Sequence, residues 1–228
     1  MNADQVAAIL PETSMLAACS REELAELIGK ASIQPVRVGD VLLEQGEEGD
    51  SIVLLLDGVA RVSMVAANGR EIILDYAESG AVLGEIGMLD GEPRTASVTT
   101  IAPGRIMRLS RAAFEGFIEA HPRVAMRMMR EMARRLRQAN DTIEADRACS
   151  AGQRLARALR RLMRPPVENT RLRHDLSQSE LGSFVGISRE NVNRQLSAWA
   201  DVGAIEMRQG RIRILDRTYI EEVADTGI

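Results

Sequence analysis

Cysteine and histidine are scarce in this sequence, and their scarcity excludes several kinds of site. There are two cysteines, Cys19 and Cys149, and two histidines, His121 and His174. A disulfide framework needs more cysteines, so we expect a reducing, cytoplasmic environment. An iron–sulfur cluster needs about four cysteine ligands, and a haem needs an axial ligand. We interpret both histidines as ordinary surface or turn residues and expect no metal centre.

Long apolar runs and catalytic constellations are also lacking. No run of about 18 or more apolar residues occurs, so we expect no membrane-spanning helix and no membrane partner. The first 15 residues lack a basic segment, which argues against a secretion signal. No nucleophile–base pair and no cluster of metal ligands is evident, so we do not expect an enzyme. The composition, 45% hydrophobic and 27% charged over 228 residues, is that of a globular protein.

Charge is divided unevenly along the chain, although the net charge is only −4. Residues 1–149 hold 16 Lys/Arg and 23 Asp/Glu, a balance of about −7. Residues 150–228 hold 13 and 10, a balance of about +3. An acidic first part and a basic second part indicate two modules, of which the second suits a polyanionic partner.

Short β-rich runs separated by glycines fill residues 33–108, for example "SIVLLLDGVARVSMV" and "EIILDYAESGAVLG". Asn68-Gly69 between two of these runs predicts a hairpin with a type I′ turn. Many short strands with glycine turns are typical of a β-sandwich or roll. Ahead of them, Ser20 and Glu23 form a capping box that predicts the start of a helix.

A long helix is predicted from Pro122 to about Arg147, because no glycine or further proline interrupts this stretch. Its length would be about 39 Å at 1.5 Å per residue. An apolar stripe with steps of three and four residues is formed by Met128, Met132, Leu136, Ala139 and Ile143. The stripe indicates packing on the chain's own β-domain or, as we favour, the seam of a dimer.

A break follows the long helix. Ser150 and Gln153 form a second capping box, which begins a new helix, so Cys149-Ser150 is a candidate hinge. The stretch Arg164-Pro165-Pro166 is predicted to end this helix.

Residues 177–202 predict two short helices joined by a tight turn. Ser177 and Glu180 form a third capping box, Gly186 can adopt the positive φ of the turn, and Ser188 caps the second helix. The residues expected to be buried are Leu181, Val185, Ile187, Val192, Leu196 and Trp199. A hairpin about Gln209-Gly210 follows, so the module is predicted to be a winged helix-turn-helix.

In such a module the second helix enters the major groove of DNA, with its first residues against base edges. Arginine pairs with guanine, and glutamate accepts from cytosine. Hydroxyls and backbone N–H groups at helix starts suit phosphates. The residues predicted to contact double-stranded DNA are Gln178, Ser179, Ser188, Arg189, Glu190, Asn191, Asn193 and Arg194. A three-helix module that binds protein is the alternative.

Three motifs in this order resemble the CRP/FNR family of bacterial transcription regulators: "GEIGMLDGEPRTASV", "EMARRLRQAN" and "SQSELGSFVGISRENVNRQL". The resemblance covers nearly the whole chain. It implies an α+β fold with a cyclic-nucleotide-binding β-roll (residues 1–121), a long dimerisation helix and hinge (122–148) and a winged helix-turn-helix (149–228). It also implies a homodimer that binds a palindromic operator, with RNA polymerase as a further expected partner.

The same resemblance makes the first motif the sugar–phosphate half of a cyclic-nucleotide site. Gly84 and Glu85 would contact the ribose, and Arg94 and Thr95 the cyclic phosphate. A carboxylate can accept the ribose 2′-OH, and a guanidinium can make a charge-assisted contact with phosphate. The other residues expected around the ligand are Val62, Leu74, Ile86, Arg135 and Asn140.

The base of the ligand is predicted from the long helix. In the cAMP-responsive member of the family, two adjacent residues reach the adenine from the two subunits, and Ala139 and Asn140 align with them. Asn140 can donate to or accept from either purine. We expect cAMP as the effector, with cGMP close behind, because Thr95 follows Arg94 as in many cGMP-binding domains. A regulator without a cyclic nucleotide, or with a cyclic dinucleotide, is the alternative.

Overall fold

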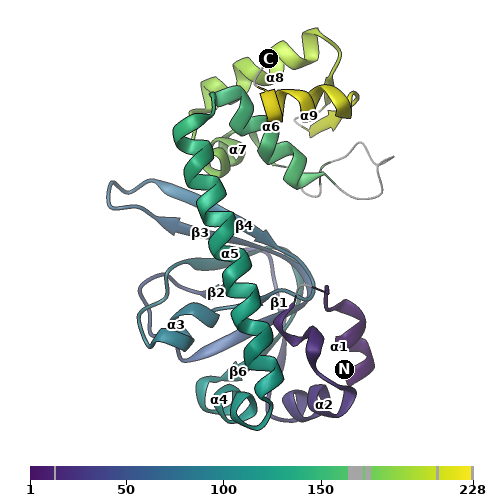
Figure 1. Cartoon of the computed structure of the whole chain (residues 1–228), viewed down its shortest axis with the longest axis vertical. Helices are drawn as coiled ribbons and strands as arrows, with labels where there is room; N and C mark the ends of the chain where they lie inside the picture. Colours follow the sequence, from purple (N-terminus) through teal and green to yellow (C-terminus); the bar gives the residue numbers. More distant parts are fainter. Residues whose placement is uncertain (13, 164–171, 173–175, 209–210, 227–228) are drawn as a thin grey trace. The chain divides into compact units, whose positions relative to one another are not determined.

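The structure is a computed structural model that describes residues 1–12, 14–163, 172, 176–208 and 211–226 (Figure 1). It divides into two compact units, Met1–Arg137 and Gln138–Ile228. The long helix α5 (Pro122–Ala148) runs through the division. Three predicted features lie outside the described residues: the helix end at residues 164–166, His174, and the turn at residues 209–210.

A six-stranded antiparallel sheet forms the centre of the first unit, as the glycine-punctuated β-rich runs predict. Its long strands, β3 (Ser51–Val65) and β6 (Ser97–Ser110), pair along most of their length. The order is β1-β6-β3-β4, with β2 paired to β6 and β5 paired to β3. The short strands are β1 (Ser32–Val36), β2 (Val41–Leu43), β4 (Glu71–Ala77) and β5 (Val82–Leu83).

Successive residues of β3 enter two different apolar clusters. Ile52, Leu54 and Leu56 join a cluster with helix residues such as Phe114, whereas Val53 and Leu55 join a cluster of strand residues. Side chains alternate between the faces of a strand, so a strand covered on both faces needs a continuous apolar run. This explains the run "SIVLLL", in which each large side chain contributes about 1.5–3 kcal/mol on burial.

The hairpin between β3 and β4 is confirmed, but its predicted turn type is wrong. The Gly69 N–H donates to the Ala66 carbonyl, and the Ala66 N–H donates to the Arg70 carbonyl. Ala67 and Asn68 are therefore the central residues of the turn, and Gly69, with φ of 78°, follows it. A three-residue loop that ends in a left-handed residue is the next most common hairpin connection after the two-residue type I′ and II′ turns.

Several helices surround the sheet. Those of the first unit that precede α5 are α1 (Ala3–Ile9), the 3₁₀ turn η1 (Met15–Ala18), α2 (Arg21–Gly29), α3 (Glu85–Asp90) and α4 (Arg111–Ala120). The capping box at the start of α2 is confirmed: the Ser20 N–H donates to Glu23 at 2.6 Å, and the Glu23 N–H donates to Ser20 Oγ at 3.2 Å. Helices α1 and α3 were not predicted.

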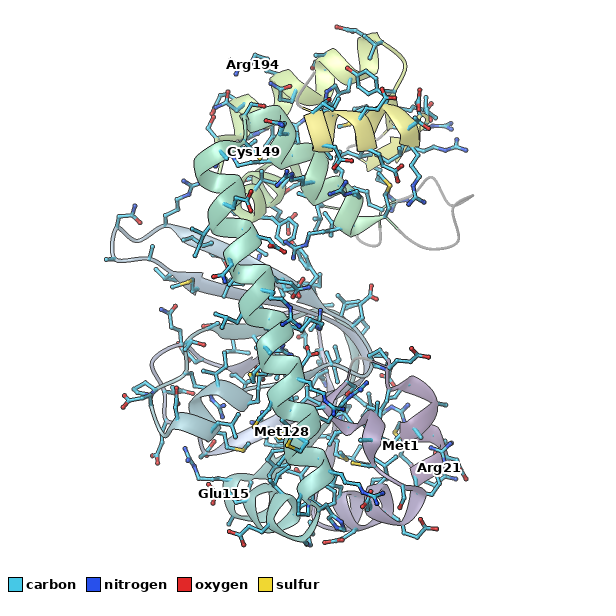
Figure 2. The ribbon with its side chains drawn as sticks, in the orientation of Figure 1. Met1, Arg21, Glu115, Met128, Cys149 and Arg194 are labelled. Atoms are coloured by element: carbon cyan, nitrogen blue, oxygen red, sulfur yellow. The ribbon has the colours of Figure 1, made fainter. Side chains whose placement is uncertain are left out.

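Helix α5 has two apolar stripes, and the predicted seam residues are divided between them. Met128 is 3% exposed and belongs to the core of the first unit, with Met132 packed against the same core (Figure 2). Leu136 and Ile143 are 64% and 52% exposed. The prediction that Met128 lies on a free seam is therefore wrong, because its turn of the helix faces the chain's own β-domain.

The second unit contains the predicted helix-turn-helix and a hairpin. Its elements after α5 are α6 (Ala151–Leu162), α7 (Gln178–Val185), α8 (Arg189–Asp201), β7 (Ile205–Arg208), β8 (Arg211–Ile214) and α9 (Arg217–Thr226). The capping boxes at Ser150 and Ser177 are confirmed, and Gly186 ends α7 with φ of 75°. Trp199 is buried, as predicted. Helix α9 was not predicted.

Candidate functional site

Arg94 lies just before β6, and its side chain is buried although it carries a charge. Only 4% of the side chain is exposed. Nη1 donates to the Gly84 carbonyl at 2.9 Å, and Nη2 donates to the Ser51 carbonyl at 2.7 Å. The Asp50 carboxylate lies 3.4 Å from Nη2. Acceptors from two segments that are far apart in sequence therefore hold one guanidinium.

The backbone around Arg94 is equally constrained. The Arg94 N–H donates to the Glu47 carbonyl at 2.8 Å, and the Gly46 N–H donates to the Arg94 carbonyl at 2.9 Å. Gly84 has φ of 85°, and a Cβ at this position would lie 2.5 Å from Arg94 Nη1. Glycine is thus required at residue 84 both for its backbone conformation and for the approach of the guanidinium.

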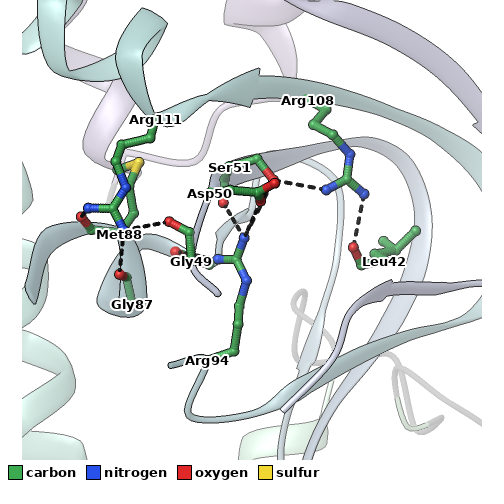
Figure 3. A network of polar contacts seen from close by, with 10 residues as sticks. Leu42, Gly49, Asp50, Ser51, Gly87, Met88, Arg94, Arg108 and Arg111 are labelled. Carbon is green, nitrogen blue, oxygen red and sulfur yellow. Dashed lines mark hydrogen bonds and ion pairs between the residues drawn. The ribbon is translucent and has the colours of Figure 1, made fainter. Parts of the chain in front are cut away.

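Two further arginines reach the same corner of the molecule (Figure 3). Arg108 donates to Ser51 Oγ at 3.1 Å, and Arg111 donates to the Gly49 carbonyl at 2.8 Å, two residues before Ser51. Burial, reinforced by Arg108 and Arg111, lowers the pKa of Arg94, and the Asp50 carboxylate opposes this shift. Three arginines gather at this corner, where the carboxylates that act on Arg94 are those of Asp50 and Glu47.

Glu85, the first residue of α3, is 2% exposed. Its Oε1 lies 2.5 Å from Arg135 Nη1 on α5. Arg135 Nε also lies 3.1 Å from Glu131, which is itself buried and bound by Arg134. Burial raises the pKa of Glu85, while the nearby Arg135 charge opposes the shift. The predicted ribose acceptor and the predicted Arg135 are therefore in direct contact, and Glu85 pairs with Arg135 rather than with Arg94.

The remaining predicted ligand residues are placed more loosely. Ile86 and Leu74 are 40% and 42% exposed, Thr95 is exposed, and Val62 is half-buried. Val62 pairs with Asp75 and Ser63 pairs with Ile73, so Leu74 is the extra residue of a β-bulge. Asn140 is exposed on the part of α5 that belongs to the second unit, and its role as reader of the base stays a prediction.

The arrangement defines what a ligand would need. One end of the segment "GEIGMLDGEPR" supplies a buried carboxylate, and the other supplies a buried guanidinium. A bare phosphate suits Arg94 alone, because the Glu85 carboxylate would repel it. A group that carries both a hydroxyl and a phosphate suits the two residues together.

The residues predicted to contact DNA gather on α7 and on the first turns of α8. Ser179, Ser188, Arg189, Glu190, Asn193 and Arg194 are exposed, and Gln178 and Asn191 are half-buried. Arg194 donates to the Asn191 side chain at 2.6 Å and projects from α8 (Figure 2). Hydrogen bonds from the backbone and from Ser188, with the Arg189 charge, lower the pKa of Glu190. A mixed cationic, acidic and amide surface therefore begins the second helix.

Some residues that shape these sites were not predicted from the sequence. A Cβ at Gly182 would lie 2.8 Å from the Ile187 carbonyl, so this glycine permits the tight turn between α7 and α8. Asp50, Ser51 and Arg111 shape the surroundings of Arg94. Gly182 could have been found from its place in "SELGSFVGIS", but the partners of the arginines leave no such signal.

Among the residues that the structure describes, no helix is both long and apolar enough to cross a membrane. Nor do three or more histidine, cysteine or acidic side chains gather there in a way that could hold a metal ion.

Comparison with known proteins gives both units a family. Residues 33–121 match the family described as "Cyclic nucleotide-binding domain", and residues 153–223 match the "Crp-like helix-turn-helix domain". The "CRP-like cAMP-activated global transcriptional regulator" of Mycobacterium tuberculosis is 32% identical over 190 residues, which cover 81% of this chain and 85% of that protein.

Solved structures agree with this relationship. The catabolite activator protein of Thermus thermophilus is 26% identical, with a TM-score of 0.55 over 92% of this chain and 97% of its own. The c-di-GMP responsive regulator CLP of Xanthomonas campestris shares the fold, with a TM-score of 0.75 at 17% identity over 86% of this chain and 99% of its own.

The two units together define a DNA-binding regulator with a cyclic-nucleotide domain, and not an enzyme. The chain belongs to the CRP/FNR family of transcription regulators. The family resemblance and the predicted fold class are thereby confirmed.

Proposed function

We propose that the protein is a homodimeric transcription regulator whose DNA binding is controlled by a cyclic mononucleotide, with cAMP as the first choice and cGMP as the second. The observation that carries the proposal is the pair Arg94 and Glu85. Both side chains are buried, although neither binds the other, and both belong to one short segment. A guanidinium can bind a phosphate and a carboxylate can accept from a hydroxyl, so one ligand that carries both groups can use both residues.

The ligand would take over part of the present hydrogen bonding of Arg94. Its two longest contacts, both at 3.4 Å, are with the exposed Asp50 carboxylate and with Ser51 Oγ. A cyclic phosphate carries a full negative charge and can approach a guanidinium at about 2.7–2.9 Å. Replacing the contact between Arg94 and Asp50 by a contact between Arg94 and the phosphate therefore favours ligand binding, and the backbone contacts that fix the arginine are kept.

The preference for cAMP is supported by relatives rather than by the base site. The Mycobacterium tuberculosis relative is named as cAMP-activated, and so is the regulator CRP of Salmonella typhimurium. Asn140 can pair with adenine or guanine, which keeps cGMP as the second choice. The named response of the Xanthomonas campestris regulator to c-di-GMP makes this cyclic dinucleotide a required comparison.

Double-stranded DNA is the proposed target of α8. Arg189 and Glu190 are exposed at its start, and Val192 and Leu196 anchor its other face in the core. This leaves the first turn free to meet base edges in the major groove. Such a target gives the protein a cytoplasmic site of action, with RNA polymerase as a further proposed partner.

The exposed stripe of α5 is the proposed dimer contact. It lies in the proposed dimerisation segment, residues 122–148, between a domain of residues 1–121 and a domain of residues 149–228. Met126, Met129, Leu136 and Ile143 are 49–64% exposed. Their steps of three, seven and seven residues follow a heptad, the spacing with which two helices pair. A second copy of the chain offers the same spacing, and two copies would suit a palindromic operator.

The test combines ligand binding with DNA binding. Calorimetric titrations with cAMP, cGMP and c-di-GMP are run in parallel, and binding to genomic fragments is then measured with and without each nucleotide at one salt concentration. We expect cAMP to bind and to strengthen DNA binding, because a ligand shifts a conformational equilibrium only through unequal affinity for the two states. Equal DNA affinity with and without every nucleotide would contradict the proposed control.

A further inference from the structure

Arg111 binds three backbone carbonyls from two separate segments. Nη1 donates to the Met88 carbonyl at 2.8 Å. Nη2 donates to the Gly49 carbonyl at 2.8 Å and to the Gly87 carbonyl at 3.1 Å. Two of these carbonyls belong to α3, and the third belongs to the loop that precedes β3 (Figure 3). One guanidinium thus bridges the helix and the loop.

The two bridged segments are in backbone contact. A Cβ at Gly49 would lie 2.5 Å from the carbonyl carbon of Gly87 and 3.0 Å from the Met88 nitrogen. Glycine at residue 49 therefore lets the loop touch α3 directly. Carbonyl groups brought this close need a donor between them, and Arg111 provides it.

Each bridged segment carries one half of the ligand site. Helix α3 begins with Glu85, the proposed ribose acceptor. The loop leads into Asp50 and Ser51, whose oxygens hold the Arg94 guanidinium. Arg111 also donates its own N–H to the Asp50 carbonyl at 2.7 Å. Arg111 thus contacts both the helix that begins with Glu85 and the loop that leads to the acceptors of Arg94.

We infer that Arg111 is a positioning residue of the ligand site: it fixes α3 against the loop before β3, and so sets the distance between Glu85 and Arg94. The inference rests on the proposed function for its ligand, but its geometric part does not need a ligand. Residues that orient the groups touching a ligand have measurable effects on affinity, because a misplaced contact is lost even when the contacting residue is present.

A purely local role for Arg111 is less consistent with its contacts. It is the first residue of α4, where its charge lies 3.8 Å from Glu115 on the exposed side of that helix. A pair at this distance and exposure contributes little. The three carbonyl contacts are shorter and lead away from α4 to the ligand site.

The experiment compares Arg111→Met, Arg111→Lys and the control Arg105→Met in the full chain. Arg105 lies on β6, the strand that directly precedes Arg111, and pairs with Asp57 on the surface. Calorimetry with cAMP and cGMP measures affinity, and amide hydrogen exchange without nucleotide measures the opening of residues 85–90. We expect Arg111→Met to weaken nucleotide binding about tenfold to a hundredfold and to speed exchange in α3. The nucleotide affinity and the α3 exchange of Arg111→Lys should lie between those of the wild type and Arg111→Met, because an ammonium keeps the charge but cannot span all three carbonyls.

The possible outcomes separate this inference from the proposed function. Wild-type affinity and unchanged α3 exchange in Arg111→Met would overturn it. If Arg111→Met does not fold, Arg111→Lys decides, and wild-type behaviour of that variant in both measurements overturns it as well. If the wild-type protein binds neither nucleotide, the proposed effector is wrong, and the exchange of α3 still decides the role of Arg111. Arg105→Met should match the wild type throughout.

Discussion

Arg135 on α5 forms an ion pair with Glu85 on α3, with Nη1 and Oε1 2.5 Å apart. The pair joins the long helix to the segment that also contains Arg94. Glu131, one turn earlier on α5, accepts from Arg135 as well, so the arginine bridges two buried carboxylates. A change at Glu85, such as contact with a ribose hydroxyl, therefore acts directly on a side chain of α5.

The first prediction concerns the pH dependence of stability. Burial raises the pKa of Glu85 in the folded chain, so folding favours its neutral form. Its contribution to stability is present below the ordinary glutamate pKa of about 4.3 and is lost as the pH rises through the raised folded value. We expect the unfolding free energy of the wild type, relative to Glu85→Gln, to fall across this window.

Urea unfolding at a series of pH values measures this difference at fixed protein concentration. Arg135→Met should extend the window to higher pH, because the Arg135 charge opposes the raised pKa of Glu85. A difference between wild type and Glu85→Gln that does not change with pH would contradict the assignment.

The second prediction concerns Arg94. Arg94→Leu should abolish nucleotide binding, because the described segment 84–98 then loses its only buried guanidinium. The change leaves the Ser51 and Gly84 carbonyls without their donor, so we expect stability to fall by about 1–3 kcal/mol without loss of the fold. Calorimetry and thermal unfolding measure the two effects, with Arg105→Leu as the surface control. Retained binding by a folded Arg94→Leu variant would show that the phosphate lies elsewhere.

The third prediction separates the two stripes of α5. Leu136→Glu should weaken dimerisation and leave the protomer folded, since this side chain is 64% exposed. Met128→Ala should instead lower the unfolding free energy by about 2–5 kcal/mol, because it opens a cavity in the core. Sedimentation measures association, and urea unfolding measures stability. The reverse pattern would place the seam on the stripe that contains Met128.

How far the sequence could predict this structure depends on the kind of signal. The capping boxes at Ser20, Ser150 and Ser177 are local, since each is completed within three residues, and all three are confirmed. The stripes of α5 are not local. Both the buried and the exposed sets repeat at helical spacing, and only the fold determines that Met128 faces the sheet.

The candidate site likewise combines residues that have a local sequence signal with residues that have none. Arg94 and Glu85 lie in one motif and were predicted together. Arg111 was missed because its acceptors are backbone carbonyls, which every residue carries and which therefore leave no pattern of residue types. Its partner Gly49 is distant in the sequence and is brought beside it by the pairing of β3 with β6.

The fourth prediction concerns base recognition by α8. Arg189→Ala should weaken binding to the specific operator by about 1–3 kcal/mol and change non-specific binding little, if the guanidinium contacts a guanine. Arg217→Ala is the matched control, because Arg217 pairs with Glu221 on α9. Binding is measured at several salt concentrations. An equal loss for specific and non-specific DNA, with a salt slope reduced by about one, would make Arg189 a phosphate contact instead.

The fifth prediction uses two glycines with similar backbones and different surroundings. Gly69 and Gly84 have φ of 78° and 85°, but a Cβ at Gly69 would meet nothing within 4 Å, whereas one at Gly84 would lie 2.5 Å from Arg94 Nη1. Gly69→Ala should therefore cost only the left-handed backbone strain of about 1–2 kcal/mol and leave nucleotide affinity unchanged. Gly84→Ala should cost more and weaken nucleotide binding at least about tenfold, because it displaces the guanidinium. Equal losses of stability and equal affinities in the two variants would mean that Arg94 can move without consequence, and its present position would then not matter for the ligand.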